Sequence, residues 1–306
     1  MATILVTGGA GFLGSHIADE LSDRGHNVRI FDRTESPYIR QDQQMLLGDV
    51  TNPEDIENAV EGCDYIYHMA ALADLNAAKT RPVTTVETNV LGTVRFLEAA
   101  RHAGVKRIMF ASTVYVYSRE GGFYKCSKQA CENYIEEFHH RYGLEYTILR
   151  YGSLYGPRAD SSNGVYRLIR QAMEEGVIHH SGGPDDRREY IHVKDAARLS
   201  ADAIGDEFAN HHLVITGNQA MRIQDLFTMF SEILGHKVEP EFSENDDDDF
   251  DPSRKNGHYK MTPYTFTPKV GHKLTTNYFV DMGQGLLQVV EQIYDEKKTE
   301  KTYSDS

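Results

Sequence analysis

The sequence predicts an α/β fold with a doubly wound, mainly parallel sheet, followed by a smaller mixed α/β domain. Two observations carry this prediction. Short apolar runs alternate with longer amphipathic stretches through the first half of the chain, and a glycine-rich turn directly follows the first apolar run. Strands separated by helices imply a parallel sheet with right-handed crossovers. After residue 155 the alternation becomes less regular, which favours a second domain.

The apolar runs give the expected elements in chain order. Six runs in the first half are typical of buried strands, namely 3–7, 27–31, 44–47, 65–69, 107–111 and 145–150. Helices are expected to begin near Phe12, Pro53, Val86, Lys125 and Asn163. Later in the chain we expect strands at 189–193 and 213–216, and helices at 193–204, 223–234 and 281–294.

These elements divide the chain into two domains. We expect residues 1–155 to form the first domain and residues 156–296 mainly the second, with 189–217 returning to the first sheet. Residues 297–306 are expected to be a frayed tail. The acidic run within 245–251 is typical of a solvated loop. The stretch 254–273 is rich in Pro, Gly and Tyr, which indicates an ordered loop region.

Composition excludes several classes of protein. With 32 Lys and Arg against 46 Asp and Glu, the formal net charge is −14, which argues against broad binding of nucleic acid or of an anionic membrane. The three cysteines, at 63, 126 and 131, have no C-x-x-C spacing, so we expect neither a disulfide framework, nor a zinc ribbon, nor any other metal site. No signal peptide and no membrane-spanning run is apparent, so the expected location is the cytoplasm.

The glycine-rich turn has the pattern of a dinucleotide site. Residues 7–14 read T-G-G-A-G-F-L-G between the first strand and the first helix. Glycines allow a tight turn and close approach of the backbone to a pyrophosphate, whose charge lies at the helix N-terminus. The predicted fold is therefore of the Rossmann type. The cofactor-binding residues expected in this turn are Gly8, Gly11, Phe12, Leu13 and Gly14.

The second strand ends in a carboxylate that bears on the choice of cofactor. Asp32 lies 18 residues beyond Gly14, about where a ribose-binding acid belongs. A carboxylate accepts hydrogen bonds from the ribose 2′-hydroxyl and repels a 2′-phosphate, so NAD is favoured. The adjacent Arg33 keeps NADP as the less favoured alternative.

A tyrosine and a lysine form the candidate catalytic pair. Tyr124 and Lys128 are spaced i, i+4, so they share one face of a helix. An ammonium stabilises a phenolate and lowers the pKa of the phenol, which lets tyrosine act as a base. Chance alone would produce about one such pair in this composition, so the context must support it. A strand ending in Ser112 and Thr113 lies 11 residues before Tyr124 and supplies hydroxyls for the same substrate oxygen.

Taken together, these motifs resemble the extended short-chain dehydrogenase/reductase family, in its NAD-dependent epimerase/dehydratase branch, and in particular UDP-glucose 4-epimerase-like members. The resemblance covers nearly the whole chain. It also includes Gly48-Asp49-Val50, His68-Met69-Ala70-Ala71, E-T-N-V-L-G-T at 87–93, L-R-Y-G-S-L-Y-G-P at 149–157 and R-E-Y-I-H-V-K-D at 188–195.

The resemblance implies roles for individual residues. It implies contacts with the cofactor for Asp49, Val50, Met69, Ala70, Ala71, Asn89 and Tyr151. The family's catalytic hydroxyl precedes a Val-Tyr pair by three residues, which matches Thr113 and leaves Ser112 as a substrate contact. Arg188 matches an arginine that binds the nucleotide diphosphate, and a guanidinium suits phosphate. Ser153 and Arg254 are weaker candidates for substrate binding.

The reaction is inferred from the two residues after Thr113. Dehydratases of this family carry an Asp-Glu pair there, and decarboxylases a Glu one residue later. This chain has Val114 and Tyr115 instead. Valine transfers no proton, so the resemblance favours epimerisation, at C4 of a UDP-sugar, with NAD recycled in each turnover. A dehydratase, a 4-keto reductase or a dehydrogenase remains the alternative within the family, and a non-catalytic NAD-binding sensor the alternative from another class.

Two further expectations come from the resemblance. Family members often form homodimers through two helices of each subunit, here those beginning near Val86 and Lys125. Only ten residues separate Thr113 from Tyr124, whereas relatives have a considerably longer segment. The short connection 118–123 predicts either a more open sugar pocket or simply a shorter loop. Because this segment differs from that of the relatives, the identity of the sugar cannot be inferred from their substrates.

Overall fold

The computed structural model describes residues 1–243 and 270–304 and divides the chain into two compact units. The first unit consists of Met1–Gly152, Ala196–Ile215 and the described part of Tyr264–Thr275. The second consists of the described parts of Ser153–Asp195, Thr216–Pro263 and Thr276–Ser306. The predicted acidic loop at 245–251, most of the loop region 254–273 and Arg254 itself lie outside the described residues.

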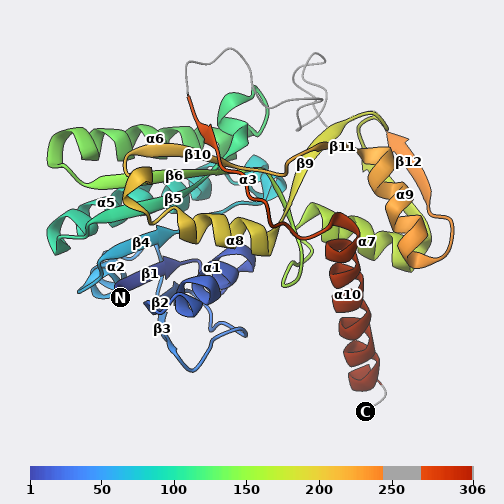
Figure 1. Cartoon of the computed structure of the whole chain (residues 1–306), viewed down its shortest axis with the longest axis horizontal. Coiled ribbons are helices and arrows are strands. Elements are labelled where there is room, and N and C mark those ends of the chain that lie inside the picture. The colour runs from blue at the N-terminus through green and yellow to red at the C-terminus, as the bar shows by residue number, and fades with distance from the viewer. Residues whose placement is uncertain (244–269, 305–306) are drawn as a thin grey trace. The chain divides into compact units, whose positions relative to one another are not determined.

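The first unit is built on one parallel sheet (Figure 1). Within the described residues the sheet has eight strands in the order β13-β10-β6-β5-β4-β1-β2-β3. Each neighbouring pair is parallel. The strands are β1 (Thr3–Thr7), β2 (Asn27–Asp32), β3 (Gln43–Leu47), β4 (Tyr65–His68), β5 (Arg107–Thr113), β6 (Glu145–Tyr151), β10 (His211–Ile215) and β13 (His272–Lys273).

This topology confirms the predicted fold class. The strand order reverses between β1 and β4, and such a switch point is where open α/β sheets bind ligands at the carboxyl ends of their strands. The glycine turn follows β1, Asp32 ends β2, Met69 follows β4 and Thr113 ends β5. The sheet therefore brings four segments that are distant in sequence to the same edge.

Helices cover both faces of the sheet (Figure 1). One face carries α1 (Phe12–Asp23) and α8 (Val193–Asp202), which are joined by an ion pair between Arg24 and Asp202. The other face carries α2 (Pro53–Val60), α5 (Gly92–Ala103) and α6 (Gly122–Tyr142), which pack on one another. The short helices α3 (Leu75–Thr80) and α4 (Pro82–Thr85) and a π-helical segment, η1 (Val86–Leu91), precede α5, and the 3₁₀ turn η2 (Val114–Tyr117) follows β5.

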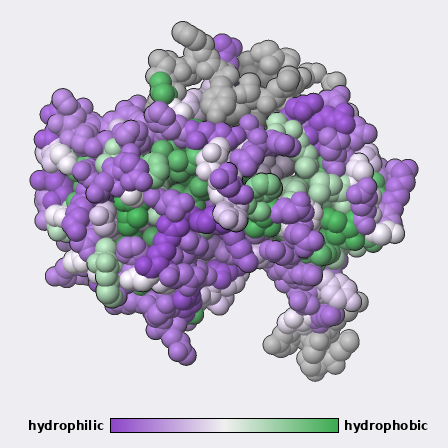
Figure 2. Space-filling view, in the orientation of Figure 1, coloured by the Kyte–Doolittle hydropathy of each residue, from purple (hydrophilic) through white to green (hydrophobic). Residues whose placement is uncertain are grey.

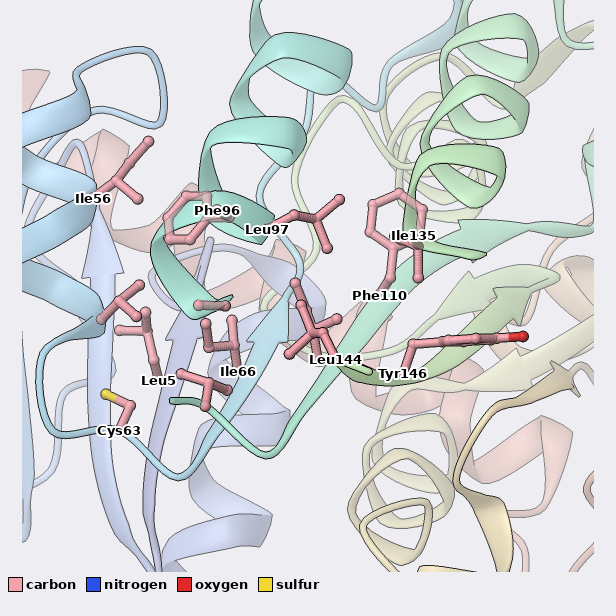
Figure 3. Packing of buried hydrophobic residues seen from close by; sticks show 14 of the residues in the cluster. Leu5, Ile56, Cys63, Ile66, Phe96, Leu97, Phe110, Ile135, Leu144 and Tyr146 are labelled. Atoms are coloured by element: carbon pink, nitrogen blue, oxygen red, sulfur yellow. The ribbon is translucent and has the colours of Figure 1, made fainter. Parts of the chain in front are cut away.

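The main core lies between the sheet and the second of these helical layers. Leu5 and Ile66 from the strands pack with Phe96 from α5 and Ile135 from α6, and all four side chains are buried (Figure 3). The six predicted strands agree with the structure to within two residues at each end. Strands that are buried on both faces, such as β1, β4 and β5, read as nearly continuous apolar runs, which makes them easy to recognise in the sequence.

The second unit is smaller and mixed. A three-stranded sheet has the order β11 (Ala220–Arg222), β9 (Arg187–His192) and β7 (Ser153–Tyr155), and a two-stranded sheet pairs β12 (Glu239–Ser243) with β8 (Val177–Ser181). Helices α7 (Gly164–Glu175), α9 (Ile223–Leu234) and α10 (Met282–Ser304) pack on one another. A 3₁₀ turn, η3 (Asp206–Phe208), belongs to the first unit.

Two predictions about domain organisation are wrong. Residues 189–217 do not return to the main sheet as a block, because β9 pairs with β7 and β11 in the second unit and only Ala196–Ile215 belongs to the first. The tail predicted to fray from residue 297 is helical, since α10 continues to Ser304.

The surface is mainly polar on the face that Figure 2 draws. Figure 2 shows hydrophilic residues over most of the face that it draws, with hydrophobic residues in separate patches. Among the helices that the structure describes, none has the length and apolar character required to cross a membrane.

Candidate functional site

The glycine turn has a geometry that only glycine satisfies. Gly8 has φ +68°, and a Cβ atom there would lie 2.8 Å from the Ala70 nitrogen. A Cβ atom at Gly14 would lie 2.2 Å from the Gly8 carbonyl oxygen. Helix α1 begins at Phe12, after Gly11, with no side-chain cap on its first turn. The backbone N–H groups of that turn, including those of Phe12 and Leu13, are therefore suited to bind a pyrophosphate.

Asp32 lies against this turn. One oxygen of its carboxylate accepts a hydrogen bond from the Ala10 N–H at 3.1 Å, and the other accepts one from the Arg33 N–H at 2.7 Å. The carboxylate is thus held at the glycine turn, where a ribose-binding acid belongs. The Arg33 side chain is exposed. The turn and Asp32 together fit NAD.

We predict that Asp32→Asn changes the preference between cofactors. The amide oxygen retains an acceptor for Ala10, but the charge that repels a 2′-phosphate is lost. NAD should bind about tenfold more weakly, as expected for loss of a charge-assisted hydrogen bond. NADP should bind more tightly than it does to the wild type. Calorimetric titration with both cofactors measures this, with Asp49→Asn as the control, which should affect both cofactors equally. An unchanged ratio of the two affinities would contradict the role of Asp32.

Asp49 and Val50 follow β3. The Asp49 carboxylate accepts hydrogen bonds from the Thr51 N–H at 2.8 Å and the Thr51 hydroxyl at 2.7 Å. Burial raises the pKa of Asp49, but these bonds and the nearby Arg33 charge lower it by more, so the group stays ionised. Val50 is buried, and a Cβ atom at Gly92 would lie 3.1 Å from its carbonyl oxygen. Cofactor contacts of Asp49 and Val50 stay predictions.

The segment after β4 is fastened to the glycine turn. The Ala70 N–H donates to the Thr7 hydroxyl at 3.1 Å, and Met69, Ala70 and Ala71 are partly buried. This brings the predicted cofactor-lining segment beside Gly8. The polar anchor of this segment is His68, whose ring lies between the hydroxyls of Thr7 and Thr93 at 2.8 and 3.1 Å. Burial, and the charge of Lys128, lower the pKa of His68 to about 3, so it is neutral.

The structure does not support direct contact between the Asn89 side chain and the cofactor. Its amide oxygen accepts from the Leu72 N–H at 2.7 Å, and its amide nitrogen donates to the Leu72 carbonyl at 3.1 Å and to the Ser127 hydroxyl at 3.0 Å. Asn89 is 1% exposed, on the π-helical segment η1. It therefore holds the end of the cofactor-lining segment against helix α6, and π-helical turns are frequent at functional sites.

The hydroxyls of two other predicted contacts are also bound internally. The Tyr151 hydroxyl bonds to the Ser200 hydroxyl at 2.6 Å in a buried position, and a cofactor contact through the rest of this residue stays a prediction. The Ser112 hydroxyl donates to the Glu132 carboxylate at 2.6 Å, and Ser112 is 2% exposed, so it is not available to a substrate. Both residues lie on the fully buried central strands, where a polar side chain must find a partner inside the protein.

The candidate catalytic residues converge at the end of β5 and the start of α6. Tyr124 is in the first turn of α6, and the Lys128 ammonium lies 5.7 Å from its ring centroid. Lys128 donates to the Ala111 carbonyl at 2.7 Å, two residues before Thr113. The Thr113 hydroxyl accepts from the Tyr115 N–H at 3.2 Å, which leaves its hydrogen for another acceptor. The predicted catalytic helix begins at Gly122, three residues earlier than expected.

Burial controls the protonation of this pair. It lowers the pKa of Lys128 to about 8. It raises the pKa of Tyr124 above its ordinary value, and the neighbouring Cys131 adds to the effect. Burial therefore acts against the lowering of the Tyr124 pKa that the spacing to Lys128 predicts. The position of Tyr124 in the first turn of α6 acts in the opposite direction, since the positive end of the helix dipole favours an anion.

The short connection after Thr113 is a tight turn. Val114 is buried, and Tyr115 packs against Gly121, where a Cβ atom would lie 3.0 Å from the Tyr115 side chain. Gly121 and Gly122 both have positive φ, at +91° and +49°. These glycines let the chain enter α6 within a few residues of η2, which explains how ten residues suffice between Thr113 and Tyr124.

The predicted substrate residues belong to the second unit. Ser153 begins β7 and pairs in register with Tyr190 of β9. Arg188 lies on β9, is 5% exposed, and donates to the Arg187 carbonyl at 2.7 Å. Their roles in substrate binding stay predictions, as does that of Arg254, which is outside the described residues.

The structure also shows polar residues that the motifs did not identify. Arg150 and Glu132 form an ion pair that is buried inside the first unit, with exposures of 1% and 0%. The sequence does contain a sign of this pair: Arg150 is a charged residue at the end of the apolar run 145–150, and a buried charge requires a buried partner. Within the described residues, the three cysteines are free and no group of His, Cys, Asp or Glu is arranged to hold a metal ion.

Comparison with known proteins places this geometry in a family. Residues 4–215 match the model of the NAD dependent epimerase/dehydratase family. A UDP-glucuronate 4-epimerase from Thermodesulfobacterium geofontis is 25% identical over 273 residues, 79% of this chain and 84% of its own length. A UDP-N-acetyl-alpha-D-glucosaminuronate decarboxylase from Bacillus cytotoxicus is 30% identical over 243 residues, 70% of this chain and 74% of its own.

A solved structure agrees with these matches. The crystal structure of UDP-glucose 4-epimerase from Thermotoga maritima with UDP-glucose superposes with a TM-score of 0.78 at 26% identity, over 96% of this chain and 99% of that chain. The family match covers the glycine turn, Asp32 and the Tyr124–Lys128 pair. The chain belongs to the NAD-dependent epimerase/dehydratase family.

Proposed function

We propose that this protein is an NAD-dependent UDP-sugar 4-epimerase. The observation that carries the proposal is the joint presence, at one edge of the sheet, of a dinucleotide-binding turn with Asp32 and of the Thr113, Tyr124 and Lys128 cluster. The 4-epimerases among the similar proteins support the reaction, and UDP-glucose in the Thermotoga maritima structure supports the substrate class.

The chain's own groups account for the proton chemistry. Tyr124 accepts the proton of the sugar 4-hydroxyl while the hydrogen on C4 leaves as hydride, which gives a 4-keto sugar. Thr113 donates a hydrogen bond to the same oxygen, and the Lys128 charge favours the phenolate. NAD⁺, when bound, accepts the hydride and later returns it. Return to the opposite face of C4, with return of the proton from Tyr124, completes the inversion with no net redox change.

Decarboxylation and dehydration are the alternatives that the similar proteins raise, since several of them are decarboxylases. Both reactions need more than hydride transfer. The positions where the family's dehydratases and decarboxylases carry acids hold Val114, which is buried, and Tyr115. A buried valine transfers no proton, which favours epimerisation. A reductase or dehydrogenase would need cofactor exchange, and a non-catalytic NAD sensor would have no need of an intact Thr113, Tyr124 and Lys128.

The experiment is proton NMR of the purified protein with UDP-, dTDP- and GDP-sugars in D₂O, without added NAD. Inversion at C4 of a UDP-sugar is the expected result. Loss of water would assign the chain to the dehydratases, and loss of CO₂ from a UDP-uronate to the decarboxylases. No change with any sugar would contradict the proposed function.

We propose further that the protein is a cytoplasmic homodimer. Large apolar side chains are exposed on α4, η1 and α6, which pack on one another: Val83, Val86, Leu91, Phe123 and Tyr134. Exposed apolar groups gathered on adjacent helices are typical of an interface. The segments beginning at Val86 and at the start of α6 are the two that the family resemblance indicates.

Val86→Glu is expected to convert the dimer to a monomer. A two-fold interface would contain this carboxylate twice, and each copy would be taken out of water into an apolar contact without a partner charge. Sedimentation velocity measures the change. Leu47→Glu serves as the control, because Leu47 is similarly exposed but lies on the edge strand β3. A wild-type protein that sediments as a monomer would contradict the proposed dimer.

A further inference from the structure

The buried ion pair between Glu132 and Arg150 lies next to the candidate catalytic cluster. Glu132 is on α6, one turn after Lys128, and Arg150 is on β6. Two parallel hydrogen bonds join them, from Arg150 Nε to Glu132 Oε1 and from Arg150 Nη2 to Glu132 Oε2, both at 2.9 Å. Removing two charges from water costs free energy that their attraction recovers only with such geometry. A buried pair of this kind therefore calls for a role other than stability.

The pair connects the catalytic helix to the strand that carries Thr113. Glu132 Oε1 also accepts the Ser112 hydroxyl at 2.6 Å, and Ser112 lies opposite Arg150 in the β5–β6 register. One turn earlier on α6, Lys128 binds the Ala111 carbonyl at 2.7 Å. Helix α6 is thus joined to β5 at two consecutive residues, Ala111 and Ser112, and Thr113 is the next residue.

The arginine holds the other side of Thr113. Arg150 Nη1 donates to the Tyr117 hydroxyl at 2.5 Å and to the Val270 carbonyl at 3.2 Å. Tyr117 ends η2, the turn that directly follows Thr113. A Cβ atom at Gly271 would lie 2.4 Å from the Tyr117 hydroxyl, so a larger residue there would displace this hydroxyl from Arg150. Thr113 is therefore flanked by Ser112, which is bound to Glu132, and by η2, which is bound to Arg150.

We propose that Glu132 and Arg150 are positioning residues that set helix α6 against the end of β5, so that Thr113 meets the same substrate oxygen as Tyr124. Neither touches the reacting atoms. The bonds of Lys128 to the Ala111 carbonyl and of Gln129 to the Val116 carbonyl also join α6 to the segment around Thr113, and the ion pair adds a connection through β6. A displacement of about 1 Å at this point can cost roughly 100-fold in rate. The proposal rests on the proposed function, because its measure is the rate of epimerisation.

The test replaces the pair by an apolar pair. In Glu132→Leu with Arg150→Met both charges are removed together, so no buried charge is left alone. The Ser112 and Tyr117 hydroxyls and the Val270 carbonyl each lose a partner, so the Tm of the variant is measured alongside its activity. We expect kcat to fall about 10–100-fold while the KM and the content of bound NAD stay close to those of the wild type. A residue with a merely structural role would change the Tm and leave kcat of the folded protein unaltered.

A milder variant tests the same connection. Ser112→Ala removes only the bond between β5 and Glu132 and leaves the ion pair intact. We expect a several-fold loss in kcat with an unchanged KM. A raised KM with an unchanged kcat would instead make Ser112 a substrate contact and would overturn the positioning role.

The control is a second ion pair, which joins β5 to β6 at the opposite end of these strands. Arg107 and Glu145 lie in register at the amino ends of β5 and β6, away from Thr113, and Arg107 is likewise buried. Glu145→Gln should leave kcat unchanged. If the wild type epimerises a UDP-sugar and the folded variant with Glu132→Leu and Arg150→Met does so equally fast, the positioning role is wrong and the proposed function is unaffected. If the wild type epimerises none, the proposed function fails first.

Discussion

Replacing Tyr124 by phenylalanine is expected to lower kcat about 1,000-fold or more and to leave NAD binding intact. The change removes a single oxygen, the one that accepts the sugar proton, and general acid–base groups contribute about 100- to 10,000-fold. The glycine turn and Asp32, which we propose as the residues that hold the cofactor, are on other segments of the chain. Single-turnover and steady-state rates, with NAD released on denaturation and quantified, measure both effects.

Tyr142→Phe is the matched control for this variant. Tyr142 is the last residue of the same helix, 52% exposed, and far along α6 from Thr113. It should retain full activity. If Tyr124→Phe also retains full activity, the proposed mechanism is wrong, whatever the substrate.

Replacing Lys128 by methionine is expected to remove activity and yet not to destabilise the protein at neutral pH. Burial lowers the Lys128 pKa from 10.5 to about 8, so the folded protein holds this ammonium at a cost. Below about pH 8 Lys128 is charged in the folded protein, and its burial lowers the free energy of unfolding by the full amount. Between about pH 8 and 10.5 the unfolded chain still binds the proton and the folded protein does not, so the free energy of unfolding of the wild type rises with pH.

The variant lacks this dependence. Relative to Lys128→Met, the wild type should therefore gain up to about 3 kcal/mol in the free energy of unfolding across that window. Urea unfolding of both proteins, freed of NAD, at several pH values measures the difference. A wild type that loses stability relative to the variant as the pH rises would contradict a lowered pKa and the buried site that causes it.

The fold was largely predictable because its signals are local. Strands such as β1 and β4 are buried on both faces and read as apolar runs, and the glycine turn is read directly from residues 7–14. The residues at the strand ends follow from topology, since parallel strands bring their carboxyl ends to one edge. For the same reason Asp32 and Thr113 could be placed from the sequence.

The partners of individual polar side chains could not be predicted in the same way. Asn89, Ser112 and Tyr151 were expected to face ligands, but each is bound inside the protein. A hydroxyl or an amide can serve either purpose, and the choice depends on contacts between residues distant in sequence, such as Ser112 with Glu132. The strand pairing of the second unit could not be predicted either, because β9 pairs with the short strands β7 and β11, whose sequences have little periodicity.

The Tyr124 pKa illustrates a related limit. The i, i+4 spacing correctly predicts that Lys128 lies near Tyr124, but not how deeply both are buried. Burial acts on both groups, lowering the pKa of Lys128 and raising that of Tyr124. Spacing along a helix gives the direction of one electrostatic effect, and only the packing around it shows which effect is larger.

The central claim is that hydride leaves C4 and returns to the same sugar. It is tested with a UDP-sugar that carries deuterium at C4 and ¹³C in its ring, mixed with an equal amount of the unlabelled sugar and turned over in ordinary water, so that deuterium passed to another molecule would appear on unlabelled carbon. We expect the 4-epimer to retain deuterium at C4, with none found at C3 or C5. Loss of the C4 deuterium to the solvent would show that a base removes this hydrogen as a proton, and it would contradict hydride transfer.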